Sequence, residues 1–187
     1  MKNLTVLISG SGSNLKALIG ACAQGIIPAH ILAVIADRDC AGQQHALAAN
    51  LPFTIVDRKQ PHFTEALLTA IPRESDLIIL AGFLSILPPE LITKYPRQII
   101  NLHPSLLPKF GGAGMYGLRV HQAALQAGEK ESGCTVHYVD SGIDSGEIIA
   151  QSRVPVFPDD TAKSLQARVQ AEEHPLLINT VARLLQQ

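Results

Sequence analysis

The sequence predicts an α/β fold in which a mostly parallel sheet carries helices on both faces and ends in an antiparallel portion. Short apolar runs alternate with helix-length segments through the N-terminal half, as expected for parallel strands joined by crossover helices. The first run leads directly into a Gly-rich turn at residues 10–14, where such folds pass from strand to helix. Near the C-terminus, two strand-like runs are joined by a loop without a helix, which favours antiparallel pairing.

The N-terminal half alternates between strands and helices. Residues 4–8 (L-T-V-L-I) are predicted to form a buried strand, and the next helix runs from the Gly-rich turn to about Gln24, where Gly25 and Pro28 stop it. Further strands are expected at residues 31–36, 53–56, 77–80 and 99–102, and helices at about 41–50, at 62–70 and, in short form, after Pro88 and Pro89.

The C-terminal part begins with a glycine-rich loop. Residues 111–117 read G-G-A-G-M-Y-G, which is too rich in glycine for a helix or strand. A helix is expected at about 120–127, strands at 135–139 and 148–156, and a final helix from Thr161. Pro175 should interrupt or kink that helix.

Composition indicates a compact chain that acts on small molecules. The length of 187 residues suits a single domain over 1–187. Hydrophobic residues make up 47% and charged residues only 17% of the chain, with a net charge of −1 and no basic run. Nucleic acid is therefore not expected as a partner. We expect a monomer or homodimer that acts on small-molecule substrates.

The cysteines and the N-terminus favour a cytoplasmic location. Three cysteines without a C-x-x-C pair argue against a disulfide framework or a structural zinc site. The chain enters a strand-like run directly after Met1-Lys2-Asn3, without the features of a signal peptide. It contains no apolar run of membrane-spanning length, so no membrane association is expected.

The segment I-I-N-L-H-P-S-L-L-P at 99–108 carries the most chemical information. Asn101 and His103 are two residues apart and so share one face of the strand, at the strand end where ligands bind in open α/β sheets. Asp144 follows in a later Gly-rich loop. Together these groups can polarise a carbonyl, donate a hydrogen bond and accept a proton, as acyl transfer to an amine requires. Taken alone, Asn101 and His103 could equally be structural turn residues.

The Gly-Ser-Gly-Ser-Asn turn predicts a phosphate site. Backbone N–H groups and the positive helix end would face the anion, and glycines permit close approach. Leu15 stands where the dinucleotide fingerprint has its third glycine, so a single phosphate monoester is favoured. The alternative is a tight turn with Ser or Asn capping the helix.

Other motifs are weaker. Residues 81–87 (A-G-F-L-S-I-L) could wall a flat heterocycle or belong to the core. The seven histidines show no metal-ligand spacing, so no metal is expected. His137 is interpreted as a packed strand histidine, and Glu172 and Glu173 by default as a solvated helix face.

Five segments together resemble the phosphoribosylglycinamide formyltransferases, within the folate-dependent formyltransferase superfamily. They are G-S-G-S-N-L at 10–15, A-G-F-L-S-I-L at 81–87, N-L-H-P-S-L-L-P at 101–108, the Asp144 loop with I-I-A-Q at 148–151, and A-R-V-Q-A-E-E-H at 167–174. The resemblance covers nearly the whole chain. It implies a Rossmann-like formyltransferase fold and 10-formyltetrahydrofolate as co-substrate.

The resemblance also implies roles for individual residues. Asn101, His103 and Asp144 would be the catalytic residues, and Gly12, Ser13 and Asn14 would bind the substrate phosphate. Glu173 would bind the glycinamide end of the substrate, and the folate would be bound by Leu84, Ser85, Ile86 and Leu87. The chain departs from the family at three places. Ser85 replaces a basic residue that many members carry, the loop 111–117 is longer than in many, and the segment at His174-Pro175 is about three residues shorter.

The implied reaction is formylation of the primary amine of 5-phosphoribosylglycinamide in de novo purine biosynthesis. Alternatives within the superfamily are formylation of methionyl-tRNA or of an amino sugar, and hydrolysis of formylfolate. A non-catalytic nucleotide-binding domain would explain the Gly-rich turn but leaves Asn101, His103 and Asp144 without a role.

Overall fold

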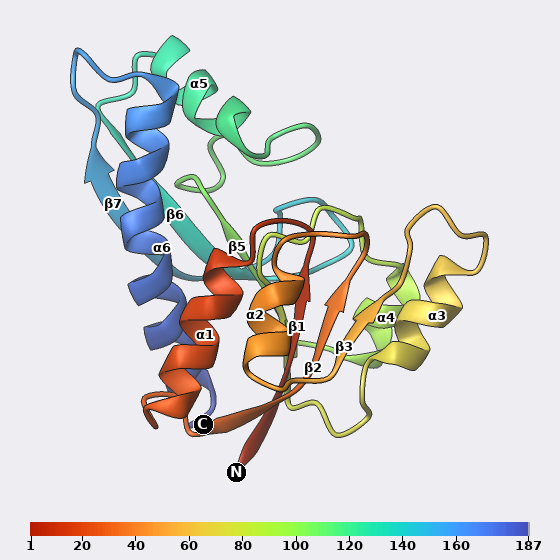
Figure 1. Cartoon of the computed structure of the whole chain (residues 1–187). Coiled ribbons are helices and arrows are strands. Elements are labelled where there is room, and N and C mark those ends of the chain that lie inside the picture. The colour runs from red at the N-terminus through yellow and green to blue at the C-terminus, as the bar shows by residue number, and fades with distance from the viewer. Residues whose placement is uncertain (187) are drawn as a thin grey trace.

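A seven-stranded sheet in the order β3-β2-β1-β4-β5-β6-β7 forms the centre of the computed structural model (Figure 1), which describes residues 1–186. The strands are β1 (Lys2–Ile8), β2 (Ala29–Ala36), β3 (Phe53–Ile55), β4 (Leu77–Leu80), β5 (Ile99–His103), β6 (Glu131–Tyr138) and β7 (Ile148–Pro155). The first five pair in parallel, whereas β6 runs antiparallel to both β5 and β7. The predicted fold class is confirmed.

Helices cover both faces of the sheet. They are α1 (Ser13–Ala23), α2 (Gln43–Ala48), α3 (Phe63–Ala70), α4 (Pro89–Lys94), α5 (Leu118–Gln126) and α6 (Ala162–Leu184). Val6 and Ile8 of β1 face a core shared with α1, α2, α5 and α6, whereas Leu7 faces a second core against α3 and α4. Burial on both faces explains why these strands read as continuous apolar runs.

Two elements differ most from their expected extents, whereas the ends of the others shift by one or two residues at most. β6 begins at Glu131 rather than 135, because residues 131–134 pair with β7 although Glu131, Ser132 and Gly133 lack a strand-like apolar pattern. The final helix is not interrupted at Pro175: α6 runs through it and spans 23 residues in all, Ala162–Leu184. Buried Leu177 and Val181 beyond the proline anchor its second half against the sheet, so packing outweighs the hydrogen bond that proline removes.

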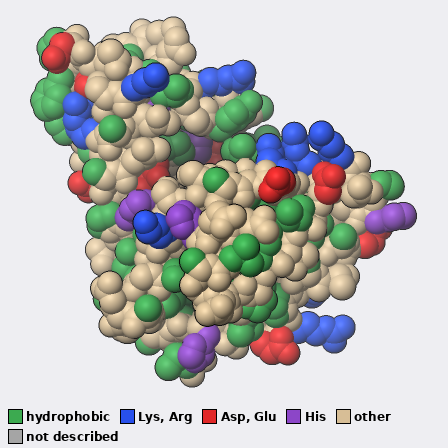
Figure 2. Space-filling model, in the orientation of Figure 1, with side chains coloured by type: hydrophobic (Ala, Val, Ile, Leu, Met, Phe, Trp, Pro, Cys, Tyr) green, Lys and Arg blue, Asp and Glu red, His purple; other side chains and the backbone are tan. Residues whose placement is uncertain are grey.

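The carboxyl ends of the parallel strands open toward a hollow. In Figure 1, α5, β7 and the upper part of α6 project away from the N-terminal strands. The same view in space-filling form shows a hollow between this projection and the rest of the molecule (Figure 2). The loops after β1, β4 and β5 lie on the side of the hollow, as expected for the ligand-binding edge of an open α/β sheet.

Candidate active site

The Gly-rich turn after β1 leaves the N-terminus of α1 open. Gly12 is the N-cap residue, with φ of 74°, and no side chain caps the helix. A Cβ atom at Gly12 would lie 2.7 Å from the Cα atom of Gly42, so both the backbone conformation and the packing require glycine here. The alternative of a Ser or Asn cap is therefore wrong, and the first-turn N–H groups remain available to an anion.

Asn14 and Glu173 meet beside this turn. The Asn14 amide donates from Nδ2 to Oε2 of Glu173 over 3.4 Å, while its buried Oδ1 has no hydrogen-bond partner within residues 1–186. Glu173 is only 8% exposed. Burial raises the pKa of its carboxyl, and the bond from Asn14 only partly offsets this. The pair therefore presents a buried carboxyl and an unpaired amide oxygen, groups suited to a polar ligand.

The default interpretation of Glu172 and Glu173 as a solvated face is wrong. Glu172 accepts a 2.6 Å hydrogen bond from Oγ of Ser152 on β7, and Glu173 is buried between α6 and the sheet. The two neighbouring carboxyls thus have separate surroundings. Of the two, Glu173 is the one bonded to the first turn of α1.

The predicted trio comes together at the end of β5. Asp144, in the β6–β7 loop, lies with Oδ1 3.4 Å from Nδ2 of Asn101 and with Oδ2 3.4 Å from Nδ1 of His103. Its Oδ2 also accepts the backbone N–H of Gly112 at 3.0 Å. Burial raises the pKa of Asp144, but the neighbouring His103 imidazole and the Gly112 amide oppose this, and the pKa lies below its ordinary value. The carboxylate is thus held ionised against the imidazole.

The hydrogen bonds of His103 define its protonation. Nε2 lies 2.8 Å from the carbonyl oxygen of Phe110; since a carbonyl only accepts, Nε2 carries the proton. In the neutral ring the lone pair is therefore on Nδ1, toward Asp144. Burial lowers the pKa of His103, while Asp144 and the Phe110 carbonyl oppose this. A proton taken up at Nδ1 would be stabilised directly by the carboxylate.

His137 is a packed strand histidine, as the sequence interpretation has it, but its contact with Asn101 was not foreseen. It lies opposite Asn101 in the β5–β6 ladder. Its Nδ1 donates to the carbonyl of Tyr138 at 2.9 Å, so Nε2 accepts from Nδ2 of Asn101 at 3.1 Å. This fixed tautomer turns the nitrogen end of the Asn101 amide toward His137 and Asp144. Only the strand register shows the contact, and the sequence carries no signal for that register.

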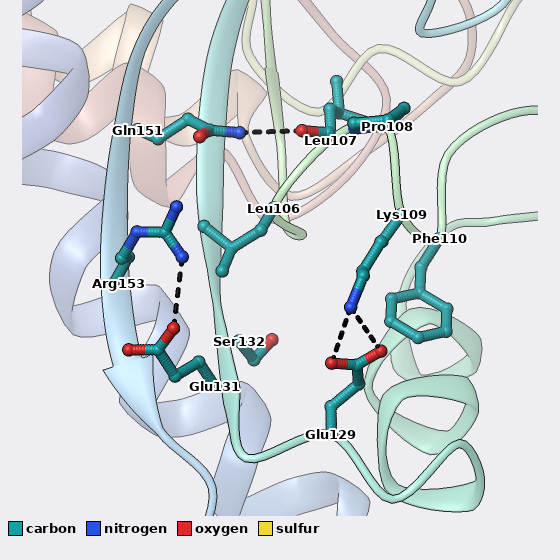
Figure 3. Close-up of a pocket in the computed structure, with 10 residues that line it drawn as sticks. All are labelled: Leu106, Leu107, Pro108, Lys109, Phe110, Glu129, Glu131, Ser132, Gln151 and Arg153. Carbon is teal, nitrogen blue, oxygen red and sulfur yellow. Dashed lines mark hydrogen bonds and ion pairs between the residues drawn. The ribbon is translucent and has the colours of Figure 1, made fainter.

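The segment after His103 is fixed to β6 and β7. Thr135 donates to the carbonyl of Ser105 at 2.7 Å, and Gln151 donates to that of Leu107 at 3.0 Å. A cavity of about 230 Å³ lies between this segment and the two strands (Figure 3), with the Lys109–Glu129 ion pair on its rim. Asn101, His103 and Asp144 do not line it. Ser105 in turn donates from Oγ to the Phe110 carbonyl over 3.5 Å, which ties that carbonyl, the partner of His103, to the same segment.

The four residues of the predicted folate wall have unequal surroundings. Leu84 and Ile86 are 50% and 74% exposed, whereas the side chain of Leu87 is buried in the second core. Ser85 donates a 2.5 Å hydrogen bond to the buried carboxylate of Asp37. Leu84 and Ile86 can thus offer side chains to a flat ligand, and Leu87 supports the wall from beneath.

The buried carboxylate of Asp37 is the centre of a hydrogen-bonded cluster beneath the predicted folate wall. Arg38 donates to both of its carboxylate oxygens at 2.8 Å. Burial raises the pKa of Asp37, but Arg38, Ser85 and Ser9 together bring it below the ordinary value. Ser9 also accepts the backbone N–H of Leu84 at 2.8 Å, so this buried cluster ties the wall to the loop after β1.

Within residues 1–186, no group of three or more His, Cys, Asp or Glu side chains is arranged to hold a metal ion. None of the helices in that range is both long and apolar enough to cross a membrane.

The fold and this Asn–His–Asp cluster define a class of group-transfer proteins, and comparison identifies the family. Residues 2–181 match the model described as Formyl transferase. The chain belongs to this family, and the resemblance inferred from the sequence is confirmed.

Individual relatives are similar over nearly the whole chain. Phosphoribosylglycinamide formyltransferase of Haemophilus influenzae is 40% identical over 187 residues, covering 95% of this chain and 86% of the relative. The chloroplastic enzyme of Arabidopsis thaliana is 35% identical over 100% of this chain, which spans 66% of that relative, just under two thirds of its length. The crystal structure of glycinamide ribonucleotide transformylase 1 from Symbiobacterium toebii superposes with a TM-score of 0.89 at 38% identity, covering 97% of this chain and 86% of that one.

Proposed function

We propose that this chain transfers the formyl group of 10-formyltetrahydrofolate to the primary amine of 5-phosphoribosylglycinamide, a step of de novo purine biosynthesis. The observation that carries the proposal is the meeting of Asn101, His103 and Asp144 at the end of β5. The uncapped N-terminus of α1 follows β1, which runs parallel to β5, so it lies at the same edge of the sheet. The names of the high-coverage relatives support formyl transfer with phosphoribosylglycinamide as the acceptor.

The amine attacks the formyl carbon directly. A C–N bond forms, the formyl oxygen takes up negative charge, and the C–N bond to the folate then breaks. Asn101 and His103 donate hydrogen bonds to the oxyanion, and Asp144, directly or through water, orients the imidazole and relays the amine proton to the leaving nitrogen. No metal and no covalent enzyme intermediate is required.

The hydrogen-bond donors assigned to the oxyanion are bonded to acceptors within the protein, so ligand binding must release them. Nε2–H of His103 is bonded to the Phe110 carbonyl and the Asn101 amide to His137 and Asp144. The 3.4 Å contact to Asp144 is the longest of these bonds and the first available for exchange. A shift at Phe110, just before the glycine-rich residues 111–117, would release His103.

Binding positions the two reactants. The first-turn amides of α1 hold the substrate phosphate, with Gly12, Ser13 and Asn14 forming the turn, and Glu173 holds the glycinamide end. The exposed side chains of Leu84 and Ile86, with the backbone of Ser85 and Leu87, hold the folate. Much of the rate acceleration then comes from proximity.

The decisive experiment compares amine substrates with and without the phosphate. The wild-type chain should formylate 5-phosphoribosylglycinamide far better than unphosphorylated ribosylglycinamide, with a shallow salt dependence because one phosphate is bound. Equal rates with both would refute the phosphate assignment. Calorimetry should show binding of the phosphorylated amine and of a folate analogue, singly and together; binding of one alone would favour a non-catalytic nucleotide-binding domain.

Location and assembly complete the proposal. Cys22, Cys40 and Cys134 are free thiols, which supports a reducing compartment and thus the cytoplasm. Residues 1–187 act as a single domain on small molecules, as monomer or homodimer, without nucleic acid or membrane partners.

A further inference from the structure

An ion pair lies at the base of the loop that carries Asp144. Arg97, between α4 and β5, bonds through its two terminal nitrogens to the carboxylate of Glu147 at 2.6 and 3.4 Å. The same guanidinium lies 4.3 Å from the ring centroid of Tyr138. Arg97 therefore joins the last residue of β6 to the residue just before β7.

These contacts hold both ends of the loop. Tyr138 donates its backbone N–H to the carbonyl of Glu147 at 2.9 Å, and Val139 donates to that of Ile99 in β5. The loop then extends to Asp144, which contacts Asn101 and His103 of the same strand. Any widening at its base moves the carboxylate relative to the imidazole.

The backbone of Arg97 is strained. Its φ of 56° lies in the left-handed region that glycine favours. Strained conformations persist where the surrounding structure holds them and often occur at functional sites. Glycine would fit this backbone better, whereas the arginine side chain makes the contacts with Glu147 and Tyr138.

We propose that Arg97 and Glu147 are positioning residues, whose ion pair stacked on Tyr138 holds the Asp144 carboxylate in place against Asn101 and His103. The proposal rests on the formyl transfer proposed above. Neither residue touches the substrates; both act through the loop.

The test uses Arg97→Gly, Glu147→Gln and the exchanged pair Arg97→Glu/Glu147→Arg in the full chain. Glycine relieves the backbone, so the Tm of Arg97→Gly should not fall, while kcat falls roughly two- to fivefold with both KM values unchanged, as for loss of one exposed ion pair. Hydrogen exchange of residues 140–147 should become faster. The exchanged pair should recover much of the wild-type kcat.

Arg153 and Glu131 provide a matched control. Their side chains, 3.2 Å apart on β7 and β6, are each 60% exposed, close to the 64% and 63% of Arg97 and Glu147. Glu131→Gln should change neither kcat nor exchange in the loop. An unchanged kcat in Arg97→Gly, with or without faster exchange, overturns the positioning role. If the wild-type chain shows no formyl transfer, the proposed function is refuted. In that case hydrogen exchange alone tests the ion pair, and unchanged exchange of the loop in Arg97→Gly would show that the pair does not hold the loop.

Discussion

Asn14 and Glu173 lie 159 residues apart in the sequence, yet the amide of one donates to the carboxyl of the other over 3.4 Å. The contact joins the first turn of α1 to the middle of α6. It thereby places the predicted phosphate loop and the predicted glycinamide-binding carboxyl at one end of the site.

Glu173→Gln should raise the KM for the amine substrate roughly tenfold or more, as loss of a hydrogen bond to a charged group does. Steady-state kinetics checks this. Glu172→Gln is the matched control, because the neighbouring carboxyl bonds to Ser152. Equal KM changes in both variants would contradict the assignment.

The same variant should alter the pH dependence of stability. Because burial raises the pKa of Glu173, the unfolded chain loses this proton first as pH rises, and stability falls from about the unfolded pKa up through the folded one. Glu173→Gln removes this fall, so urea unfolding should show a gain in stability near pH 7 that vanishes in acid. A gain that is independent of pH would point to packing.

Asn101→Ala should lower kcat about 10² to 10³-fold, the loss typical of one preorganised oxyanion donor. The measured Tm should change little, since the amide lies at the open end of β5 rather than in either core. Near-normal turnover would contradict its role.

His137→Ala should reduce kcat by about tenfold with smaller effects on KM. It removes the acceptor that orients the Asn101 amide, comparable to one lost hydrogen bond. In the Asn101→Ala background the same change should have almost no effect. Additive losses in the double variant would show that His137 acts independently of Asn101.

Asp144→Asn should abolish most of the activity while calorimetric affinity for the phosphorylated amine stays within a few-fold. The amide keeps the size of the carboxylate but can neither stabilise a proton at Nδ1 of His103 nor relay one. Affinity lost in proportion to turnover would instead mark Asp144 as a binding residue.

His121 should make the protein less stable in mild acid. Burial, and to a lesser degree His103, lower its pKa from 6.5 to about 4, so the unfolded chain takes up this proton first as pH falls. Stability should drop between pH 6.5 and about 4, by up to about 3 kcal/mol. Urea unfolding of His121→Gln should show a flatter profile over this range, whereas His30→Gln, at an exposed position of β2, should keep the slope. An unchanged slope in His121→Gln would contradict the assignment.

The sequence by itself determined the succession of strands and helices along the chain, because apolar periodicity and turn residues are local signals. It also placed Asn101 and His103 on one face of a strand end, since side chains alternate along any strand. The open turn at Gly12 followed from the same local logic. Its glycine is required by a positive φ, and in addition by the approach of Gly42 from another segment.

Tertiary structure decided the rest, because those contacts depend on strand register and helix packing between distant segments. The register of β5 against β6 brought His137 to Asn101, and β7 extended β6 back to Glu131. Packing of α6 buried Glu173 beside Asn14 and carried the helix through Pro175. These features depend on hydrogen bonds and packing between distant segments. The local sequence pattern does not show which distant segments meet.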